Sequence, residues 1–207
     1  MNSKSQFGQD EIVLEYLKNK EEGFFVEIGA SDGILLSNCF LLEKKYKWDG
    51  ICVEPIPYKF NSLIQNRNCI CINKAVFSKS NLEVDFSIHK YGEYTEDGIS
   101  GMTEYLDKHR EKVLKNETRI KVKTQTLNDI LEENNSPDII DYLSLDTEGT
   151  ELEILKSVNL NKYKFKIISI EHNHILKRRN EIFKLLTSYN YKLYKSIKAD
   201  DFFIYQL

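Results

Sequence analysis

The sequence predicts an α/β fold in which helices cover both faces of a mainly parallel central sheet of about seven strands. Three observations predict it. Short apolar runs that read as buried strands alternate with segments of helical periodicity. The first apolar run ends in a glycine turn, as in sheets that bind a ligand beyond the ends of their strands. The chain has 207 residues, enough for one core but short for two, so residues 1–207 are expected to form a single domain.

The N-terminal half alternates between the two types of element. Residues 10–18 carry apolar side chains at helical spacing and predict a lead-in helix within residues 1–20. Residues 23–29, Gly-Phe-Phe-Val-Glu-Ile-Gly, predict a central strand that is covered on both faces. The elements expected next are a helix at 38–46, a strand at 50–54, a helix at 58–66 and a strand at 69–77. This order is that of βαβ units.

The second half continues the pattern after an interruption. Strands are expected at 82–88 and 120–127, and residues 89–120 are expected to form a loop and helical insertion over the active site. The glycine-bearing part of this insertion, Tyr91–Met102, is placed to close over a ligand. The later elements are a helix at 128–133, a strand at 140–145, a helix at 150–158, a strand at 165–171, a helix at 177–188, and closing strands at 192–197 and 201–206.

Composition excludes several classes of function. The net charge of -3 gives no basic field for a phosphate backbone, so no nucleic acid partner is expected. No apolar stretch reaches 18 residues and the N-terminus lacks a signal sequence, so we expect no membrane span and a cytoplasmic location. The four cysteines lack paired metal-ligand spacing and are expected to be free, small hydrophobic residues. The oligomeric state stays open, with a homodimer as one option.

The first glycine turn carries negative charge. Glu27 precedes Gly29 and Ala30, and Asp32 follows within the loop. A pyrophosphate would be repelled by these carboxylates, and the G-x-G-x-x-G pattern of dinucleotide sites is absent. S-adenosylmethionine has no phosphate and carries a sulfonium and an ammonium. The turn therefore favours S-adenosylmethionine over a nicotinamide cofactor.

Further cofactor contacts are expected on either side of this turn. Glu54 and Pro55 end the second strand about 20 residues later, where a carboxylate can accept hydrogen bonds from two ribose hydroxyls; the alternative is a surface charge. Gln9 and Asp10 either reach the methionine part or simply begin the lead-in helix. Ser100 is placed to pack on the adenine or on the acceptor.

At six places the chain resembles the FkbM-type methyltransferases. The matching pieces are Ser-Gln-Phe-Gly-Gln-Asp at 5–10, Phe-Val-Glu-Ile-Gly-Ala at 25–30, Ser37-Asn38, Gly-Ile-Cys-Val-Glu-Pro at 50–55, Tyr-Leu-Ser-Leu-Asp-Thr-Glu-Gly at 142–149 and Ile-Glu-His-Asn at 170–173. The resemblance implies a Rossmann-like class I methyltransferase fold, and adds Ser37 and Asn38 to the expected cofactor contacts. It also implies methyl transfer from S-adenosylmethionine to oxygen, commonly a hydroxyl of a sugar, glycan or secondary metabolite. Cys39 stands where the family often has threonine.

Polar residues at two later strand ends are the catalytic candidates. Asp146 and Glu148 follow one strand, and Glu171 and His172 end the next. Methyl transfer to an alcohol is an in-line displacement that needs the hydroxyl aligned and its proton removed. Asp146, Glu171 and His172 are a candidate ligand set for Mg²⁺, and Asp146 also counts among the cofactor contacts. Without a metal, His172 is the expected general base.

Other interpretations of these residues stay open. The acidic residues could favour the N-terminus of the following helix, where Thr150-x-x-Glu153 has the form of a capping box. His172 and His174 could be ordinary hydrogen-bonded or exposed histidines. As a function, the alternative to an enzyme is a non-catalytic module that binds S-adenosylmethionine and acts as a partner or sensor.

Overall fold

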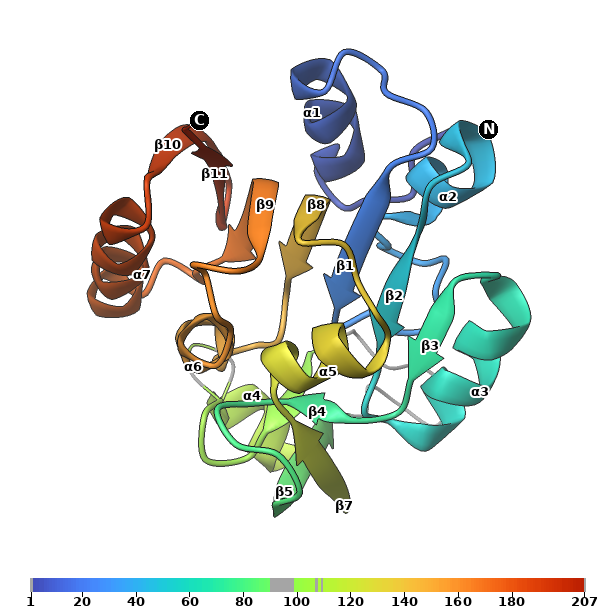
Figure 1. Ribbon diagram of the computed structural model, residues 1–207. Coiled ribbons are helices and arrows are strands. Elements are labelled where there is room, and N and C mark those ends of the chain that lie inside the picture. The colour runs from blue at the N-terminus through green and yellow to red at the C-terminus, as the bar shows by residue number, and fades with distance from the viewer. Residues whose placement is uncertain (1, 90–98, 107, 109, 207) are drawn as a thin grey trace.

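The computed structural model describes residues 2–89, 99–106, 108 and 110–206 and contains a seven-stranded sheet (Figure 1). The strand order is β10-β11-β9-β8-β1-β2-β3. β11 runs antiparallel to both of its neighbours, and the other pairs are parallel. The predicted α/β fold with a mainly parallel sheet is confirmed. The strands are β1 (Phe24–Ile28), β2 (Asp49–Val53), β3 (Ile70–Ile72), β8 (Ile139–Leu145), β9 (Lys164–Glu171), β10 (Tyr191–Ile197) and β11 (Asp200–Tyr205).

Helices cover both faces of this sheet, as predicted (Figure 1). Because side chains alternate along a strand, Phe25 of β1 packs towards one set of helices, and Val26 and Ile28 pack towards the other. The first set is α1 (Gln9–Tyr16), α2 (Phe40–Tyr46) and α3 (Pro57–Asn66); the second is α5 (Leu127–Glu133), α6 (Glu151–Lys156) and α7 (Leu176–Ser188). The two apolar clusters lie on opposite sides of the sheet and form its core.

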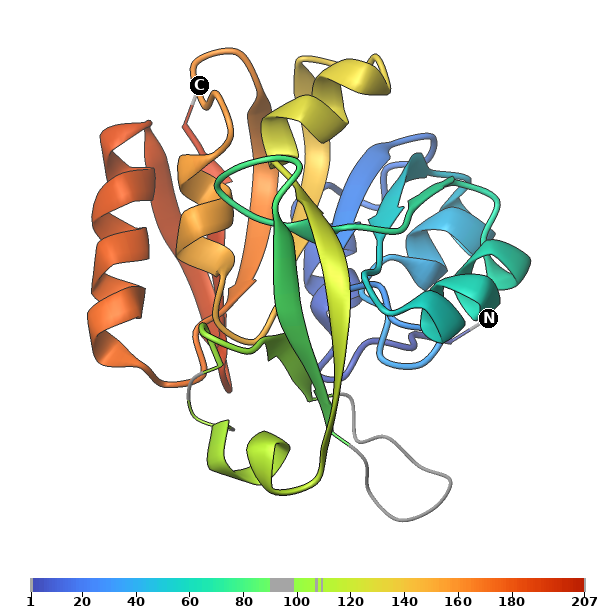
Figure 2. The same cartoon turned by 90° about the horizontal axis from the view of Figure 1, so that it is seen from below.

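A second, four-stranded sheet was not predicted. Its order is β4-β7-β5-β6, with β4 parallel to β7 and the other pairs antiparallel. Figure 2 shows the long strands β5 and β7 side by side in front of the first sheet. Its strands are β4 (Ala75–Val76), β5 (Glu83–His89), β6 (Ser100–Met102) and β7 (Glu117–Gln125). Helix α4 (Arg110–Lys115) lies between β6 and β7 in the chain.

This second sheet corrects two predictions. The single strand expected at 69–77 is two strands in different sheets, because the chain leaves the first sheet after Ile72 and re-pairs with β7 from Ala75. The insertion at 89–120 contains strand β6 and the start of β7 as well as helix α4. Most of the loop predicted at Tyr91–Met102 lies outside the described residues, and its last three residues form β6.

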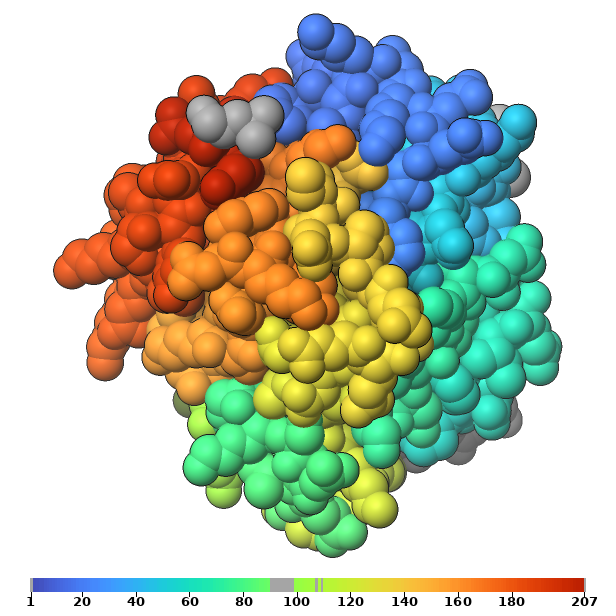
Figure 3. Space-filling model, in the orientation of Figure 1, coloured from blue at the N-terminus to red at the C-terminus, as the bar shows by residue number. Residues whose placement is uncertain are grey.

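The lead-in segment packs against the C-terminal strands. The rings of Tyr16 in α1 and Tyr194 in β10 lie 5.2 Å apart between centroids, and Ser5 forms an isolated bridge with Leu36. In Figure 3 the N-terminal residues and the C-terminal strands form adjoining parts of the surface.

Among the described residues, no helix is long and apolar enough to cross a membrane.

The order of the strands fixes where a ligand can bind. From β1 the chain adds β2 and β3 on one side and then returns to add β8 and β9 on the other. The helices that follow β1 and β8 therefore lie on opposite faces and leave a crevice beyond the carboxyl ends of these two strands.

Candidate functional site

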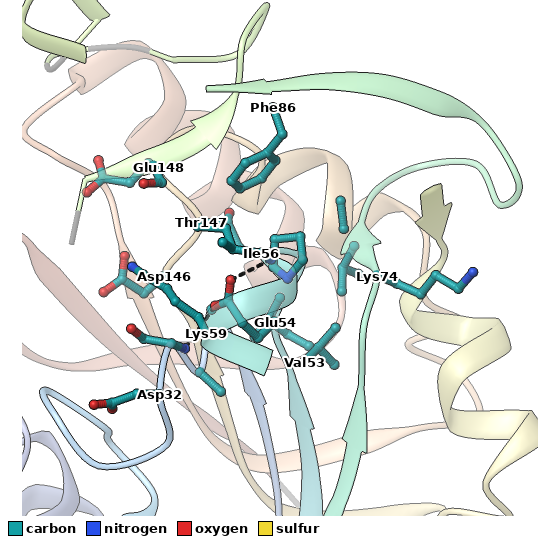
Figure 4. Close-up of a pocket in the computed structure, with 18 of the residues that line it drawn as sticks. Asp32, Val53, Glu54, Ile56, Lys59, Lys74, Phe86, Asp146, Thr147 and Glu148 are labelled. Atoms are coloured by element: carbon teal, nitrogen blue, oxygen red, sulfur yellow. Dashed lines mark hydrogen bonds between the residues drawn. The ribbon is translucent and has the colours of Figure 1, made fainter. Parts of the chain in front are cut away.

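A cavity of about 510 Å³ lies at this crevice, a volume typical of small-molecule sites. Its walls come from the ends of β1, β2 and β8 and from residues of the second sheet. Figure 4 shows Phe86 of β5 on one side, Asp146 and Glu148 near one another, and Lys74 pointing away at the opposite end. Ser100 and Pro55, both predicted cofactor contacts, also line the cavity.

The turn after β1 brings three strand ends together. The N–H groups of Gly29 and Ala30 both donate to the carbonyl of Val53, at 3.0 Å each. Gly29 has a φ of 91°, and a Cβ at this position would lie 2.0 Å from the carbonyl oxygen of Asp146. Only glycine fits between the ends of β1 and β8. Gly29 and Ala30 therefore present backbone directly to the cavity, as the sequence predicted.

Glu54 is buried and fixed at the cavity wall. Its two carboxylate oxygens accept the N–H groups of Ile56 at 2.8 Å and of Ser31 at 2.9 Å (Figure 4). When ionised, carboxylate oxygens only accept hydrogen bonds, which is the chemistry needed to bind ribose hydroxyls. Asp32 also lines the cavity, and its Oδ1 accepts the N–H of Ile34 at 2.9 Å, so this carboxylate shapes the loop as well.

Glu27 does not line the cavity, although a cofactor contact was predicted for it. It lies on the same face of β1 as Phe25, the face covered by α2 and α3, where it accepts the Ser37 hydroxyl, the Asn38 N–H at 2.6 Å and Arg67 Nη1 at 3.1 Å. Burial raises the pKa of Glu27, and Arg67 offsets part of this effect. Ser37 lines the cavity and Asn38 does not. Both residues hold the loop in place through their hydrogen bonds to Glu27.

Gln9 and Asp10 also lie outside the cavity lining. Gln9 Nε2 donates to Asp200 Oδ2 at 2.7 Å, and Asp10 Oδ1 accepts the hydroxyls of Ser3 and Ser5 at 2.7 Å each. Their partners come from the N-terminal segment and from β11. The geometry favours the second of the two sequence interpretations, in which these residues begin and anchor the lead-in helix.

Three carboxylates meet beside the glycine turn, where β8 ends. Ligand oxygens of Asp146, Glu148 and Glu171 all lie within 4.8 Å of one another. Asn173 Nδ2 bridges two of them, donating to Glu148 Oε2 at 3.0 Å and to Glu171 Oε2 at 2.8 Å. Asp146 and Glu148 line the cavity, and Glu171 lies behind them.

The pKa values of two of these groups are raised. Protein surrounds the Asp146 carboxyl although it opens into the cavity, and this burial raises its pKa, helped by the charges of Asp200 and Glu151. Burial also raises the pKa of Glu171, together with repulsion from Asp146 and Glu148. Like charges this close are stabilised by a proton or a cation between them. The pKa of Glu171 is raised further than that of Asp146, so Glu171 is the carboxyl of the pair that holds a proton more readily.

His172 is not part of this cluster. It is buried, its Nδ1 accepts the N–H of His174 at 3.0 Å, and its Nε2 lies 3.7 Å from Asp201. Burial lowers the pKa of His172, against the opposing charge of Asp201. The predicted ligand set of Asp146, Glu171 and His172 is therefore corrected: Glu148 stands where His172 was expected, because the turn after β9 directs the imidazole away from the cavity.

The predicted capping box at the start of α6 is absent. The Thr150 hydroxyl donates to the Thr147 hydroxyl rather than accepting from the helix, and Glu153 pairs with an exposed lysine. Glu151 Oε1 accepts the N–H groups of Thr147 and Gly149 at 3.1 Å each, in the turn that precedes the helix. Glu151 therefore fixes this turn, and Asp146 and Glu148 line the cavity.

Several lining residues were not predicted. Ile56 follows β2, Ala75 and Val76 follow β3, and Thr147 follows β8; their position after a strand end was the signal that could have found them. Phe86 lies in the strand expected at 82–88, but no local pattern placed this strand in a second sheet at the cavity. Two exposed apolar residues, Leu35 and Tyr58, form part of the rim.

Comparison with known proteins decides the family. The model of the methyltransferase FkbM domain matches residues 27–193. The chain belongs to the FkbM methyltransferase family. The match spans the glycine turn, Glu54 and the carboxylate cluster, and so contains every wall of the cavity. Among curated proteins, no match to the chain is found.

Solved structures share the fold. An FkbM methyltransferase from Methylobacillus flagellatus KT is 14% identical with a TM-score of 0.55; the match covers 89% of this chain and 44% of that one. A putative RNA methyltransferase from Pyrococcus horikoshii is 11% identical with a TM-score of 0.50, over 96% of this chain and 82% of that one. The FkbM chain thus spans less than half of the length of its M. flagellatus relative, and both likenesses establish the class I methyltransferase fold.

Proposed function

We propose that this FkbM domain transfers the methyl group of S-adenosylmethionine to a hydroxyl of a small-molecule or glycan acceptor. One observation carries the proposal: the cavity has one end with a fixed carboxylate, Glu54, a backbone-lined turn beside it, and a second end with a carboxylate cluster that adjoins this turn and the second sheet. The first end suits the cofactor, and the second suits a hydroxyl that must lose a proton.

The residues at the first end fit S-adenosylmethionine. Glu54 would accept the ribose hydroxyls, Gly29 and Ala30 would allow close approach of the methionine part, and Asp32 and Asp146 would balance its positive charges. No basic side chain lies in the glycine turn to hold a pyrophosphate. Bound S-adenosylmethionine supplies an electrophilic methyl group.

At the second end, the cluster would take the proton of the acceptor hydroxyl. Asp146 lies on the cavity wall and is the group proposed to accept it, since its raised pKa brings its basicity closer to that needed near neutral pH. Glu171, hydrogen-bonded to Asp146, and Asn173 hold the cluster in position. Phe86 and Met102 add an apolar wall that orients the acceptor and excludes water.

The cluster also has the ligand chemistry of a Mg²⁺ site. Three carboxylate oxygens within 4.8 Å are hard ligands of the kind that Mg²⁺ takes, and a cation would replace the shared proton. A bound Mg²⁺ would polarise the acceptor hydroxyl. The dependence of turnover on Mg²⁺ distinguishes the two forms of the proposal.

The test begins with calorimetric titration of S-adenosylhomocysteine into the full chain and into Glu54→Gln. We expect micromolar binding that the substitution weakens about tenfold, roughly 1.4 kcal/mol. Glu153→Gln is the control, because this half-buried residue pairs with Lys156 on the helix surface and lies outside the cavity lining. Absence of binding in the wild-type chain would refute the methyltransferase proposal.

A panel of hydroxylated acceptors with labelled S-adenosylmethionine then tests turnover, with Mg²⁺ and with EDTA. Asp146→Asn should lower turnover by a factor of about 10² to 10⁴. Cofactor binding without turnover of any acceptor would instead favour the non-catalytic module. Turnover that EDTA abolishes would assign Mg²⁺ to the cluster.

A further inference from the structure

A pair of thiols lies beneath the cofactor loop, outside the site described above. Cys52 in β2 is fully buried, and Cys69 is half-buried one residue before β3 begins. Their sulfurs are 3.5 Å apart. Cys71 is the partner of Cys52 in the register of the two strands, but its Sγ contacts the backbone carbonyl of Cys69 at 3.5 Å. All four cysteines are free thiols.

A buried guanidinium stands beside these thiols. The Arg67 side chain is inaccessible to solvent, and its plane lies 5.3 Å from the ring centre of Phe25. Its Nη2 has no hydrogen-bond partner in the part of the chain that the structure describes. The positive charge of Arg67 favours the thiolate form of both Cys52 and Cys69.

The two thiols are not equivalent. Hydrogen-bonding contacts with Cys52 and Cys71, together with the charge of Arg67, lower the pKa of Cys69 to about 5 despite its partial burial. Burial raises the pKa of Cys52, which therefore stays protonated. Cys69 is both the more acidic thiol and the more accessible one, and these are the two properties that make a cysteine react with oxidants.

We infer that Cys69 and Cys52 are a redox-active dithiol that hydrogen peroxide converts to an internal disulfide. The Cys69 thiolate would attack the peroxide oxygen, break the O–O bond and become a sulfenic acid, while the leaving hydroxide takes up a proton to form water. The Cys52 sulfur would then attack the Cys69 sulfur, lose its proton and release a second water. Two thiols are oxidised by two electrons and one peroxide is reduced to two waters.

Arg67 connects this pair to the cavity. Its Nη1 donates to the Gly33 carbonyl at 3.3 Å and to the Ser37 hydroxyl at 3.1 Å, at two points of the loop that follows β1. Closing the sulfur distance from 3.5 Å to about 2.05 Å would draw Cys69, two residues after Arg67, towards Cys52 of β2. Because Ser37 lines the cavity, the disulfide should disturb the cofactor end; this step rests on the proposed function.

The test treats the full chain with equimolar hydrogen peroxide, alkylates the free thiols and maps the peptides by mass spectrometry. We expect one disulfide, Cys52–Cys69, with loss of two hydrogens. It should be absent from Cys69→Ser and Cys52→Ser and present in Cys71→Ser, the matched control on the neighbouring position. A Cys69–Cys71 disulfide, or a sulfinic acid at Cys69 in place of any disulfide, would overturn the inference.

A second measurement tests the link to the cavity. Oxidised wild-type chain should bind S-adenosylhomocysteine about fivefold or more weakly, the lower end of typical coupling between sites, and dithiothreitol should restore binding. Peroxide-treated Cys52→Ser should bind as it does when reduced. Equal binding by the oxidised and reduced wild-type chain would refute the link. If the reduced chain does not bind at all, the proposed function fails, and the peptide map still decides the dithiol.

Discussion

Arg67→Met should destabilise the fold through the two carboxylates that it leaves behind. Arg67 Nε donates to Glu43 at 2.6 Å and Nη1 donates to Glu27 at 3.1 Å, with all three side chains at most 6% exposed. Methionine fills similar space without the charge. Breaking a buried ion pair by removing one partner typically costs about 3–5 kcal/mol, because a charge is left uncompensated. We expect the free energy of unfolding to fall by an amount in this range at pH 7.

The assay is equilibrium unfolding in urea at pH 7 and pH 4. Burial alone would raise the pKa of Glu43, but Arg67 and Lys44 outweigh it and hold the pKa below its ordinary value of 4.5. The stability contributed by this pairing is therefore present above pH 4.5 and is lost as the pH falls below it. Glu27, whose pKa is already raised, is protonated more readily in the variant. The difference between wild type and Arg67→Met should thus shrink towards pH 4.

Lys121→Met provides the control, since Lys121 is 58% exposed and pairs with a surface carboxylate. The Lys121→Met substitution should lower the free energy of unfolding by less than about 1 kcal/mol. A loss below about 1 kcal/mol for Arg67→Met at pH 7, or a loss that is the same at both pH values, would refute the reasoning.

Three other substitutions test separate parts of the structure. Asp141→Ala should lower the free energy of unfolding by about 1.5–3 kcal/mol at pH 7, because the buried carboxylate accepts the Phe24 N–H at 3.0 Å and pairs with two lysine ammonium groups. The pKa of Asp141 is lowered, so the difference between wild type and variant in urea unfolding should be smaller below pH 3.8. Gly29→Ala should lose at least about 2 kcal/mol in thermal unfolding and also lose S-adenosylhomocysteine binding, since φ is 91° and the added Cβ meets the Asp146 carbonyl. Glu171→Gln should raise the free energy of unfolding by about 1 kcal/mol at pH 8 in EDTA and by less at pH 5. The reason is that a carboxyl whose pKa is raised in the folded state destabilises the fold increasingly as the pH rises above 4.5. A larger gain at pH 5 than at pH 8 would contradict this.

The first sheet could be predicted because its strands are buried on both faces. β1, β2, β8 and β9 read as near-continuous apolar runs between helices, and that pattern has few other interpretations. The second sheet is different. β7 alternates between buried and exposed positions, and its pairing with β5 joins residues such as Phe86 and Ile120 that are far apart in the chain. Nothing local to either strand specifies that partner or its register.

The site residues also fall into those that the sequence could predict and those that it could not. Gly29 and Glu54 were predicted because strand ends meet at one edge of a parallel sheet whatever the details of the loops. The direction of an individual side chain depends on the pleat and the turn, and there the predictions for Glu27 and His172 were wrong about contact with the cavity. For Glu27 a signal existed: it alternates with Val26 and Ile28, which face α5 and α6, and so had to face α2 and α3.

The second sheet is contributed by one uninterrupted segment, from Ala75 to Gln125, which leaves the first sheet after β3 and returns at α5. Insertions, deletions or wholesale replacement within this segment would reshape the wall that carries Phe86 and Met102 while the turn after β1 and Glu54 keep their backbone partners. Under the proposed function, such an arrangement would let acceptor preference diverge between homologues without loss of the cofactor. It also marks the two boundaries at which chimeras between family members are best joined.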